Sequence, residues 1–475
     1  MKVVISNPPW ETDSGYGCRS NTRWPHTRKD KYLIFPIYLA YTAAILEKSG
    51  VETVLVDAVA EEYDSAGFIS RIKKENADIC FIETSTPTIE QDLKNALAVK
   101  KILNVKVFLF GTHATVYHRQ ILESNPGIDG IIRGEFEFTI KDISLGKELK
   151  NIVGLTYADK NSVIQINQDR PFVVDLDEFP FPAWHCFDMK KYESHLYRSP
   201  SAMMITSRGC PFQCTYCLWP DVMYGHRQRF RSAENVCDEM ETLIEKYGVK
   251  EIRFDDDTFA LNPKHVLAIC DEIEKRGINK KIQWTCFGHI AQDDEKLYRR
   301  LRRAGCFKID FGVESGSPKI LKYMKKSLNP AKARRVVKMC KAAGLQVYCD
   351  FMMGFPHETK EDIEMSIDLA RSLDCDFIQV SFVVPYPGTR MFADGVRENF
   401  LIDPYNWESY AACAPKINTG EISPESLDKL YRLFWRKFYL RPGVIFRRLR
   451  KAIVSKDEFV RTWKGFISFL KRISA

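Results

Sequence analysis

Short apolar runs alternate with amphipathic helical patterns over about the first 140 residues of the chain. The runs have the length of strands, whereas the pattern at 38–48 has the period of a helix. A loop rich in Arg, Gly and Trp lies between the first strand and this helix. Such alternation predicts a parallel α/β sheet, in which ligands bind at the carboxyl ends of the strands. The predicted strands are residues 3–6, 52–57, 79–82, 106–110 and 130–133.

The pattern changes between about 145 and 195, where helical periodicity is absent. Two runs at 151–157 and 163–166 flank a polar turn and predict a hairpin. Residues 177–184 contain prolines at short intervals and form the predicted linker between two domains.

Beyond about residue 200 the alternation of strands and helices resumes. Six successive strand–helix units predict a partial or complete parallel barrel, with its active site at the carboxyl ends of the strands. The predicted strands are 202–206, 251–254, 282–286, 307–312, 346–352 and 377–382. The predicted helices are 233–247, 263–275, 294–304, 330–343 and 360–373.

The composition is that of a globular protein, with 45% apolar and 28% charged residues among 475. No apolar run approaches the roughly 20 residues of a membrane-spanning helix, and the first residues do not resemble a signal peptide. We therefore expect a cytoplasmic protein. Fourteen cysteines then indicate buried thiols and metal ligation rather than disulfides.

The positive charge is concentrated in the tail. Residues 431–475 contain thirteen Lys or Arg against two acidic residues, a balance of +11, so a net charge of +8 leaves −3 for the rest. This distribution argues against a nucleic-acid-binding body. Aromatic and basic positions lie on opposite helical faces at 428–442, and the pattern recurs at 444–454. Two interpretations stay open, namely helices that cap the barrel and a peripheral segment on anionic lipid.

Three cysteines lie close together directly after the first strand of the second half. Cys210, Cys214 and Cys217 have the spacing CxxxCxxC. Three thiolates on one loop can bind three irons of a [4Fe-4S] cluster and leave the fourth iron open. S-adenosylmethionine (SAM) can occupy that iron, and reductive cleavage then releases a 5′-deoxyadenosyl radical. The alternative is a zinc site, which needs a fourth ligand, and His226 lies nine residues further along.

The motif CxxxCxΦC, with Tyr216 before the third cysteine, resembles the radical SAM superfamily. The resemblance implies a partial (βα)6 barrel with SAM bound at several strand ends. Residues 254–259 match the segment that binds the methionine amino group, 312–316 match the ribose or carboxylate segment, and 353–359 match the adenine side. Each segment alone could be an ordinary turn. The residues that the resemblance assigns to SAM are Tyr216, Asp255, Asp256, Glu314, Ser315 and Gly354.

The first half resembles the cobalamin-binding branch of this superfamily, through segments 7–9, 39–46, 84–88, 111–115 and 130–135. In that branch cobalamin lies on the carboxyl edge of a Rossmann-like sheet. The usual DxHxxG motif is absent, so the resemblance implies cobalamin without a lower imidazole ligand. The rival interpretation is an α/β domain that only supports the barrel. The residues assigned to cobalamin are Thr84, Ser85, Gly111, Thr112 and His113, although for His113 packing or capping is the competing role.

The resemblance divides the chain into four parts. They are a cobalamin-binding domain at 1–142, a hairpin and Pro-rich linker at 143–197, a radical SAM barrel at 198–395 and a helical basic region at 396–475. Within the branch, residues 217–220 and 224–232 are similar to the hopanoid-associated radical SAM enzymes and the anaerobic magnesium-protoporphyrin monomethyl ester cyclases. Both groups act on large lipophilic substrates.

We therefore expect a radical SAM enzyme that, with cobalamin, methylates, rearranges or cyclises an unactivated carbon of a lipid-like or natural-product substrate. A reductant such as flavodoxin or ferredoxin would supply the electron. The alternatives are a radical enzyme without cobalamin and a non-catalytic iron–sulfur electron carrier. A methylthiotransferase is disfavoured, because only Cys18 and Cys80 precede Cys186 and that family carries further N-terminal cysteine ligands.

Overall fold

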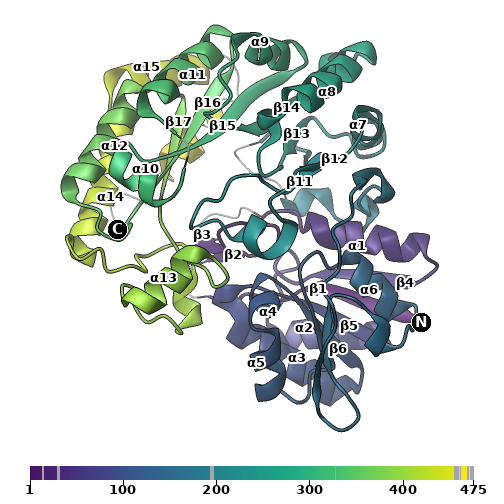
Figure 1. The fold of residues 1–475 in the computed structure, drawn as a ribbon. Coiled ribbons are helices and arrows are strands. Elements are labelled where there is room, and N and C mark those ends of the chain that lie inside the picture. Colours follow the sequence, from purple (N-terminus) through teal and green to yellow (C-terminus); the bar gives the residue numbers. More distant parts are fainter. Residues whose placement is uncertain are drawn as a thin grey trace.

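The computed structural model describes residues 1–12, 15–28, 33–192, 197–326, 328–453, 459–460, 462–467 and 470. Within them the chain forms two sheets that lie side by side, one from each half of the sequence (Figure 1). None of the described helices has both the length and the apolar character needed to cross a membrane.

The first sheet has seven strands in the order β4-β1-β5-β6-β7-β8-β9. The pairs from β4 to β7 are parallel, and the last two strands run antiparallel. The bounds are β1 (Lys2–Asn7), β4 (Glu52–Asp57), β5 (Ile79–Thr84), β6 (Lys106–Gly111), β7 (Gly130–Ile132), β8 (Leu155–Ala158) and β9 (Ile164–Ile166). All five predicted parallel strands are confirmed. The hairpin β8–β9 extends this sheet, although the sequence pattern places it with the linker at 143–197.

Helices cover both faces of the first sheet, which is why its strands are apolar on both sides. One face packs on α1 (Ile37–Lys48) and α6 (Glu137–Ser144), and the other on α2 (Ser65–Glu75), α3 (Ile89–Leu103) and α5 (His118–Ser124). A short helix α4 (Thr112–Val116) follows β6, and a small hairpin, β2 (Tyr16–Cys18) and β3 (His26–Arg28), lies in the loop after β1.

The second sheet has six parallel strands in chain order, β10-β13-β14-β15-β16-β17. All six predicted strands are confirmed, and each connects to its neighbour through a helical segment. The bounds are β10 (Ser201–Met204), β13 (Glu251–Phe254), β14 (Gln283–Gly288), β15 (Cys306–Glu314), β16 (Gln346–Met353) and β17 (Phe377–Phe382). In the described part of the chain β17 does not pair with β10, so the sheet is open.

The helices of the second half pack on one face of this sheet (Figure 1). Their start points follow from N-caps such as Ser232, Asn262 and Thr359, whose side chains accept hydrogen bonds from the first helical turn. The bounds are α7 (Ala233–Tyr247), α8 (Pro263–Lys275), α9 (Glu295–Arg303), α10 (Pro318–Tyr323), α11 (Pro330–Ala342) and α12 (Lys360–Ser372). Except for α10, they confirm the helices that the sequence predicts.

The helices with complete described bounds after the last strand are α13 (Arg390–Glu398), α14 (Pro424–Tyr439) and α15 (Pro442–Ala452). The apolar face of α14 packs against β16 and β17, where Phe434 contacts Phe351 and the Tyr439 hydroxyl donates to the carbonyl of Ile378 at 2.9 Å. The capping interpretation thus holds for α14. Residues 454–458, 461, 468–469 and 471–475 of the basic tail lie outside the described part.

A buried ion network joins the two sheets. Arg208, on the short strand β11 (Ser207–Arg208), contacts Glu135 at 2.7 Å and Glu137 at 2.8 Å. Arg229, on β12 (Arg229–Phe230), contacts Glu135 at 3.0 Å. All four side chains are nearly inaccessible to solvent. The loops that follow β7 and β10 are therefore held against each other.

Candidate active site between the two sheets

The three clustered cysteines lie on the loop after β11, and that loop is fixed by its backbone. Gly209 has φ +87°, and a Cβ there would lie 2.4 Å from the carbonyl oxygen of Arg227, so only glycine fits. The amide of Cys210 donates to the carbonyl of Gly225, and the amide of Cys217 donates to the carbonyl of Cys214. All three cysteines are half-buried free thiols.

The sulfur positions separate the two interpretations of the motif. Among the described residues, one triad of potential metal ligands has all its ligating atoms within 4.8 Å of one another. This triad is Glu47, His185 and Cys186, so the three clustered cysteines do not meet that limit. Zn–S bonds of about 2.3 Å require sulfurs closer together than this limit. In the described structure Cys210, Cys214 and Cys217 are thus more widely spaced than zinc ligands, a spread that suits a polynuclear cluster. Burial raises the pKa of the Cys210 thiol to about 11, so a metal must displace its proton.

Three consecutive aspartates follow β13 and have different roles. Asp256 accepts hydrogen bonds from the Thr206 amide at 2.6 Å and the Ser207 hydroxyl at 2.9 Å, which ties the strand end of β10 to that of β13. Burial raises its pKa to about 6. Asp255 contacts Arg253 at 3.1 Å.

Asp257 lies nearest the cysteine loop. Its Oδ2 accepts the Gly209 amide at 3.2 Å, and its Oδ1 lies 3.1 Å from an Nη of Arg23. Arg23 belongs to the loop between β2 and β3, so it reaches from the first half of the chain into the second. Its guanidinium also lies 4.6 Å from the ring centre of Trp219. Asp257 lies within the predicted segment 254–259 but was not among its assigned residues. Arg23 was missed, although the arginine-rich loop was a signal.

Glu314, at the end of β15, is brought together with Tyr216. The Tyr216 hydroxyl donates to Oε1 of Glu314 at 3.1 Å, and Nζ of Lys326 lies 2.6 Å from the same oxygen. Glu314 has φ +65°, which is strained for a residue with a side chain, and the strand register shifts between Gly312 and Glu314. This backbone distortion directs the Glu314 carboxylate toward Tyr216, and Lys326 holds the carboxylate there by an ion pair. Sequence reasoning missed Lys326.

Ser315 and Gly354 shape the neighbouring loops. Ser315 is fully buried and its hydroxyl lies 3.1 Å from that of Ser366 on α12, so it anchors the loop. Gly354 has φ +88°, and its amide donates to Glu358, as does the amide of Phe355 at 3.1 Å. Burial raises the pKa of Glu358 to about 8. Glu358 was also missed by sequence reasoning.

A cleft lies where the first sheet's carboxyl edge faces the cysteine loop. Thr84, Ser85, Gly111 and Thr112 line it from the first half, as the sequence predicts. Gly111 is required because a Cβ would lie 2.3 Å from the carbonyl oxygen of Thr84. From the second half the cleft is lined by Leu218, Trp219, Met223, Tyr224 and Tyr386.

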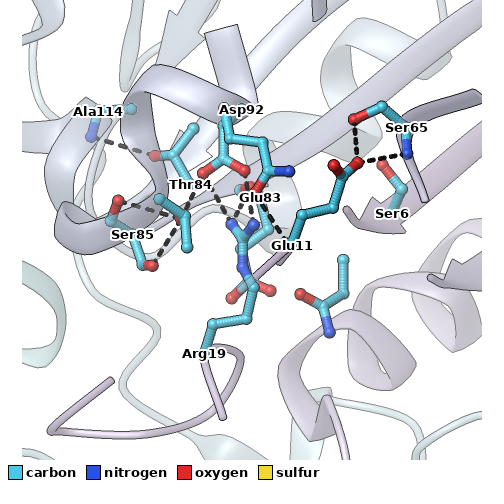
Figure 2. A network of polar contacts seen from close by, with 12 residues as sticks. Ser6, Glu11, Arg19, Ser65, Glu83, Thr84, Ser85, Asp92 and Ala114 are labelled. Atoms are coloured by element: carbon cyan, nitrogen blue, oxygen red, sulfur yellow. Dashed lines mark hydrogen bonds and ion pairs between the residues drawn. The ribbon is translucent and has the colours of Figure 1, made fainter. Parts of the chain in front are cut away.

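Polar atoms of the cleft are buried without partners in the described part of the chain. They are Nε of Arg19, Oδ1 of Asn21 and Oε2 of Glu83. Figure 2 shows Arg19 held by Asp92, with its second contact to the carbonyl of Glu83 at 2.7 Å. Burial raises the pKa of Glu83 to about 7. Unmet donors and acceptors of this kind fit a ligand whose rim carries amides, as the corrin ring does.

His113 does not line this cleft. Its ring packs 4.9 Å from the rings of Tyr117 and Trp407, and Nδ1 lies 3.3 Å from the Thr86 hydroxyl. Burial lowers its pKa to about 3, so the imidazole is neutral. The geometry is that of a packed histidine.

Known families match both halves of the chain. The radical SAM superfamily matches residues 204–370, and the B12 binding domain matches residues 25–144. An uncharacterized methyltransferase of Pyrococcus horikoshii is 34% identical over 453 residues, which cover 94% of this chain and 94% of the relative. The chain is a cobalamin-binding radical SAM enzyme.

Other relatives of this radical SAM enzyme carry different activities. The anaerobic magnesium-protoporphyrin IX monomethyl ester cyclase of Cereibacter sphaeroides is 26% identical over 470 residues, covering 94% of this chain and 73% of the relative. Two solved structures share the fold at 15% identity. The cobalamin-dependent radical enzyme OxsB gives a TM-score of 0.72 over 99% of this chain and 71% of its own. The methyltransferase TsrM from Kitasatospora setae gives 0.69 over 93% and 89%.

The cofactors of this enzyme are a [4Fe-4S] cluster, SAM and cobalamin, and the residues present fit them. Cys210, Cys214 and Cys217 offer three free thiols on one loop, which is the donor set that such a cluster needs. The cleft beside Trp219 has unmet polar atoms that would suit cobalamin. These two sites adjoin, because Leu218 and Trp219 follow the last cluster cysteine directly and line the cleft.

Proposed function

We propose that this radical SAM enzyme transfers a methyl group to an unactivated carbon of a small organic substrate. The observation that carries the proposal is the contact between its two sites, since Cys217 is followed by residues that line the cobalamin cleft. When bound, the cofactors supply a carbon-centred radical and a transferable methyl group. The name of the Pyrococcus horikoshii relative supports methylation, whereas cyclisation is the second candidate because of the cyclase relatives.

We further propose that SAM lies along the carboxyl ends of the second sheet, which is then a partial (βα)6 barrel. Glu314, held by Lys326 and Tyr216, would accept a hydrogen bond from the ribose or the ammonium group. Asp255 would face the methionine ammonium, and Gly354 would leave room for the adenine. Asp256 and Ser315 would act through the loops that they anchor. The predicted domain limits at 142, 197 and 395 belong to this proposal.

The chain's own residues then have three tasks. The cysteine loop binds the cluster and leaves one iron open. Glu314, Tyr216 and Lys326 orient SAM. The buried network of Arg208, Glu135 and Glu137 keeps the two sheets docked, which excludes water from the radical.

Anaerobic reconstitution tests the proposed function. We expect the holoenzyme with a chemical reductant to convert SAM to 5′-deoxyadenosine, and protein purified without oxygen to show the visible spectrum of cobalamin. Cys217→Ser should lose iron and deoxyadenosine formation, whereas Cys413→Ser, at an exposed thiol, should retain both. An iron–sulfur electron carrier would yield no deoxyadenosine. A radical enzyme without cobalamin would yield deoxyadenosine and lack the spectrum.

We propose two partners besides the substrate. A one-electron reductant of the flavodoxin or ferredoxin class would deliver the electron to the cluster. The exposed apolar side chains Ile445, Phe446 and Leu449 of α15 stand among basic residues, which supports peripheral contact with anionic lipid.

A further inference from the structure

The face of the second sheet that the helices leave uncovered carries charged side chains. We call it the inner face. In parallel strands paired residues share a face, and the register pairs Arg253 with Thr285, Thr285 with Lys308 and Asp310 with Tyr348. Asp350 lies two residues after Tyr348 on the same strand and therefore belongs to this face as well. Its neighbours Cys349 and Phe351 point to the buried helical side.

The cations of the inner face already have partners. Arg253 lies 3.1 Å from Asp255 and donates to the Tyr197 hydroxyl at 2.6 Å. Lys308 lies 3.7 Å from Asp310, and its ammonium group is 5.4 Å from the ring centre of Tyr197. Tyr197 thus closes the amino-terminal end of this face.

Asp350 has no such partner. In the part of the chain that the structure describes, its carboxylate makes no hydrogen bond or ion pair, and it is half-buried. It pairs in register with Gly312, beside which both the carboxylate of Glu314 and the ammonium group of Lys326 lie, since a Cβ on Gly312 would be 2.3 Å from Glu314 Oε1 and 2.8 Å from Lys326 Nζ. Burial, together with Glu314 and Asp310, raises the pKa of Asp350. Lys326 already pairs with Glu314 at 2.6 Å, so Asp350 is the carboxylate that a cationic ligand would pair with.

A second observation points to a ligand on the same face, nearer the amino-terminal ends of the strands, where Thr285 pairs with Lys308 and Asp310 with Tyr348. Oγ1 of Thr285 and Oδ1 of Asp310 are buried and lack hydrogen bonds among the described residues, and Thr285 is only 1% exposed. Unmet polar atoms on one face indicate a polar binding surface. A directly coordinated metal does not fit, because the acidic residues of this face do not form a described triad within 4.8 Å.

We propose that Asp350 binds the ammonium group of the substrate, so that the substrate is a small polar amine and not a lipid. The inference rests on the proposed function, because Asp350 lies beside Glu314, the residue proposed to orient SAM. An ammonium group at Asp350 places the attached carbon chain toward the carboxyl ends of the strands, where the radical forms.

The test uses n-pentylamine as the probe and full-length holoenzyme. We expect n-pentylamine to bind the wild-type protein and Asp368→Asn, a matched change at an exposed carboxylate of α12, with equal affinity. Asp350→Asn should weaken this binding about tenfold or more, because a charge-assisted hydrogen bond is lost. Pentanoate and n-pentanol, which have the same chain length, should bind the wild-type protein no better than they bind Asp350→Asn.

Several outcomes would overturn the proposal. They are equal binding of n-pentylamine by wild type and Asp350→Asn, binding of n-pentanol as tight as that of the amine, and no binding of the amine by wild type. If Asp350→Asn fails to fold, the wild-type comparison of amine with alcohol decides alone. Deoxyadenosine formation by the wild type is measured separately. If the wild type forms deoxyadenosine but does not prefer the amine, only this inference is contradicted. If it prefers the amine but forms no deoxyadenosine, only the proposed function is contradicted.

Discussion

At the scale of single residues, a few side chains set the chemistry of the site by contacts across the fold. Lys326 holds the carboxylate of Glu314 at 2.6 Å, and Tyr216 donates to the same oxygen. The positive φ of Glu314 shows that the surrounding structure maintains a strained backbone at this point. Such strain is retained where it positions a functional group, and here that group faces the cysteine loop through Tyr216.

Lys326→Gln tests the positioning of Glu314. We expect the KM for SAM in deoxyadenosine formation to rise about tenfold with a smaller change in kcat, because the charge-assisted contact to Glu314 is lost. Lys325→Gln, at the exposed neighbouring lysine, is the matched control and should leave both parameters unchanged. Equal effects of the two substitutions would contradict the role of Lys326.

The buried carboxyl of Glu358 should make the free energy of unfolding decrease as pH rises, because its pKa is higher in the folded protein than in the unfolded chain. Burial raises its pKa in the folded protein from 4.5 to about 8, so the folded state retains a proton that the unfolded state has lost between these values. Stability should therefore fall as pH rises through this window, by of order 1 kcal/mol per pH unit, and level off above it. Glu358→Gln should flatten this dependence. Thermal midpoints of both proteins measured across the window provide the check, and parallel curves would refute it.

At the scale of elements, the helices after the last strand divide into a packed part and an exposed part. Trp435 and Phe438 of α14 are buried against the second sheet. On α15, by contrast, Phe446 is 70% and Leu449 is 56% exposed. Arg447 and Arg448 tie α15 back to Asp374 and Phe377, so the helix is held with its apolar side outward.

Vesicle binding tests the exposed part. Phe446→Ser combined with Leu449→Ser should weaken co-sedimentation with phosphatidylserine vesicles about tenfold, because two buried apolar side chains are lost from the lipid interface. Met365→Ser combined with Val396→Ser removes exposed apolar side chains from α12 and α13 and should have no effect. If wild type sediments no better than the α15 variant, the membrane contact is wrong.

At the scale of the whole molecule, the site exists only while the two sheets stay docked. The cleft has one wall from each half, and Arg23 crosses from the first half to Asp257 in the second. The contact between the two sheets is stabilised by a buried network in which Arg208 forms ion pairs with both Glu135 and Glu137. Removal of the arginine would leave Glu137 buried without a counter-ion and Glu135 with Arg229 alone, which is costly.

Arg208→Met should therefore separate the two halves in unfolding. We expect a destabilisation of about 3–5 kcal/mol and a calorimetric transition that splits into two. Arg227→Met, at an exposed arginine before β12, is the control and should keep the wild-type profile. A single transition at the wild-type midpoint for Arg208→Met would show that the network does not hold the halves together.

Most of the secondary structure could be predicted from the sequence because periodicity and capping are local properties. The strands β13 and β17 and the helices α7 and α8 begin and end at the predicted residues. The three clustered cysteines could also be singled out from the sequence, because all three lie on one loop and their spacing can be read directly. The predicted hairpin is confirmed as β8–β9, but its pattern identifies two paired strands and not the sheet that they join.

What the sequence alone determined is thus the set of elements and the class of chemistry, and it singled out three cysteines as candidate cluster ligands. Only the tertiary structure decided which polar residues meet. Arg23 and Asp257 are separated by 234 positions, and Lys326 reaches Glu314 through a loop with no recognisable motif. In the sequence nothing distinguishes Asp350 from other strand residues, and only the strand register places it beside Gly312. Side-chain convergence of this kind depends on strand order and loop strain, which no local pattern encodes.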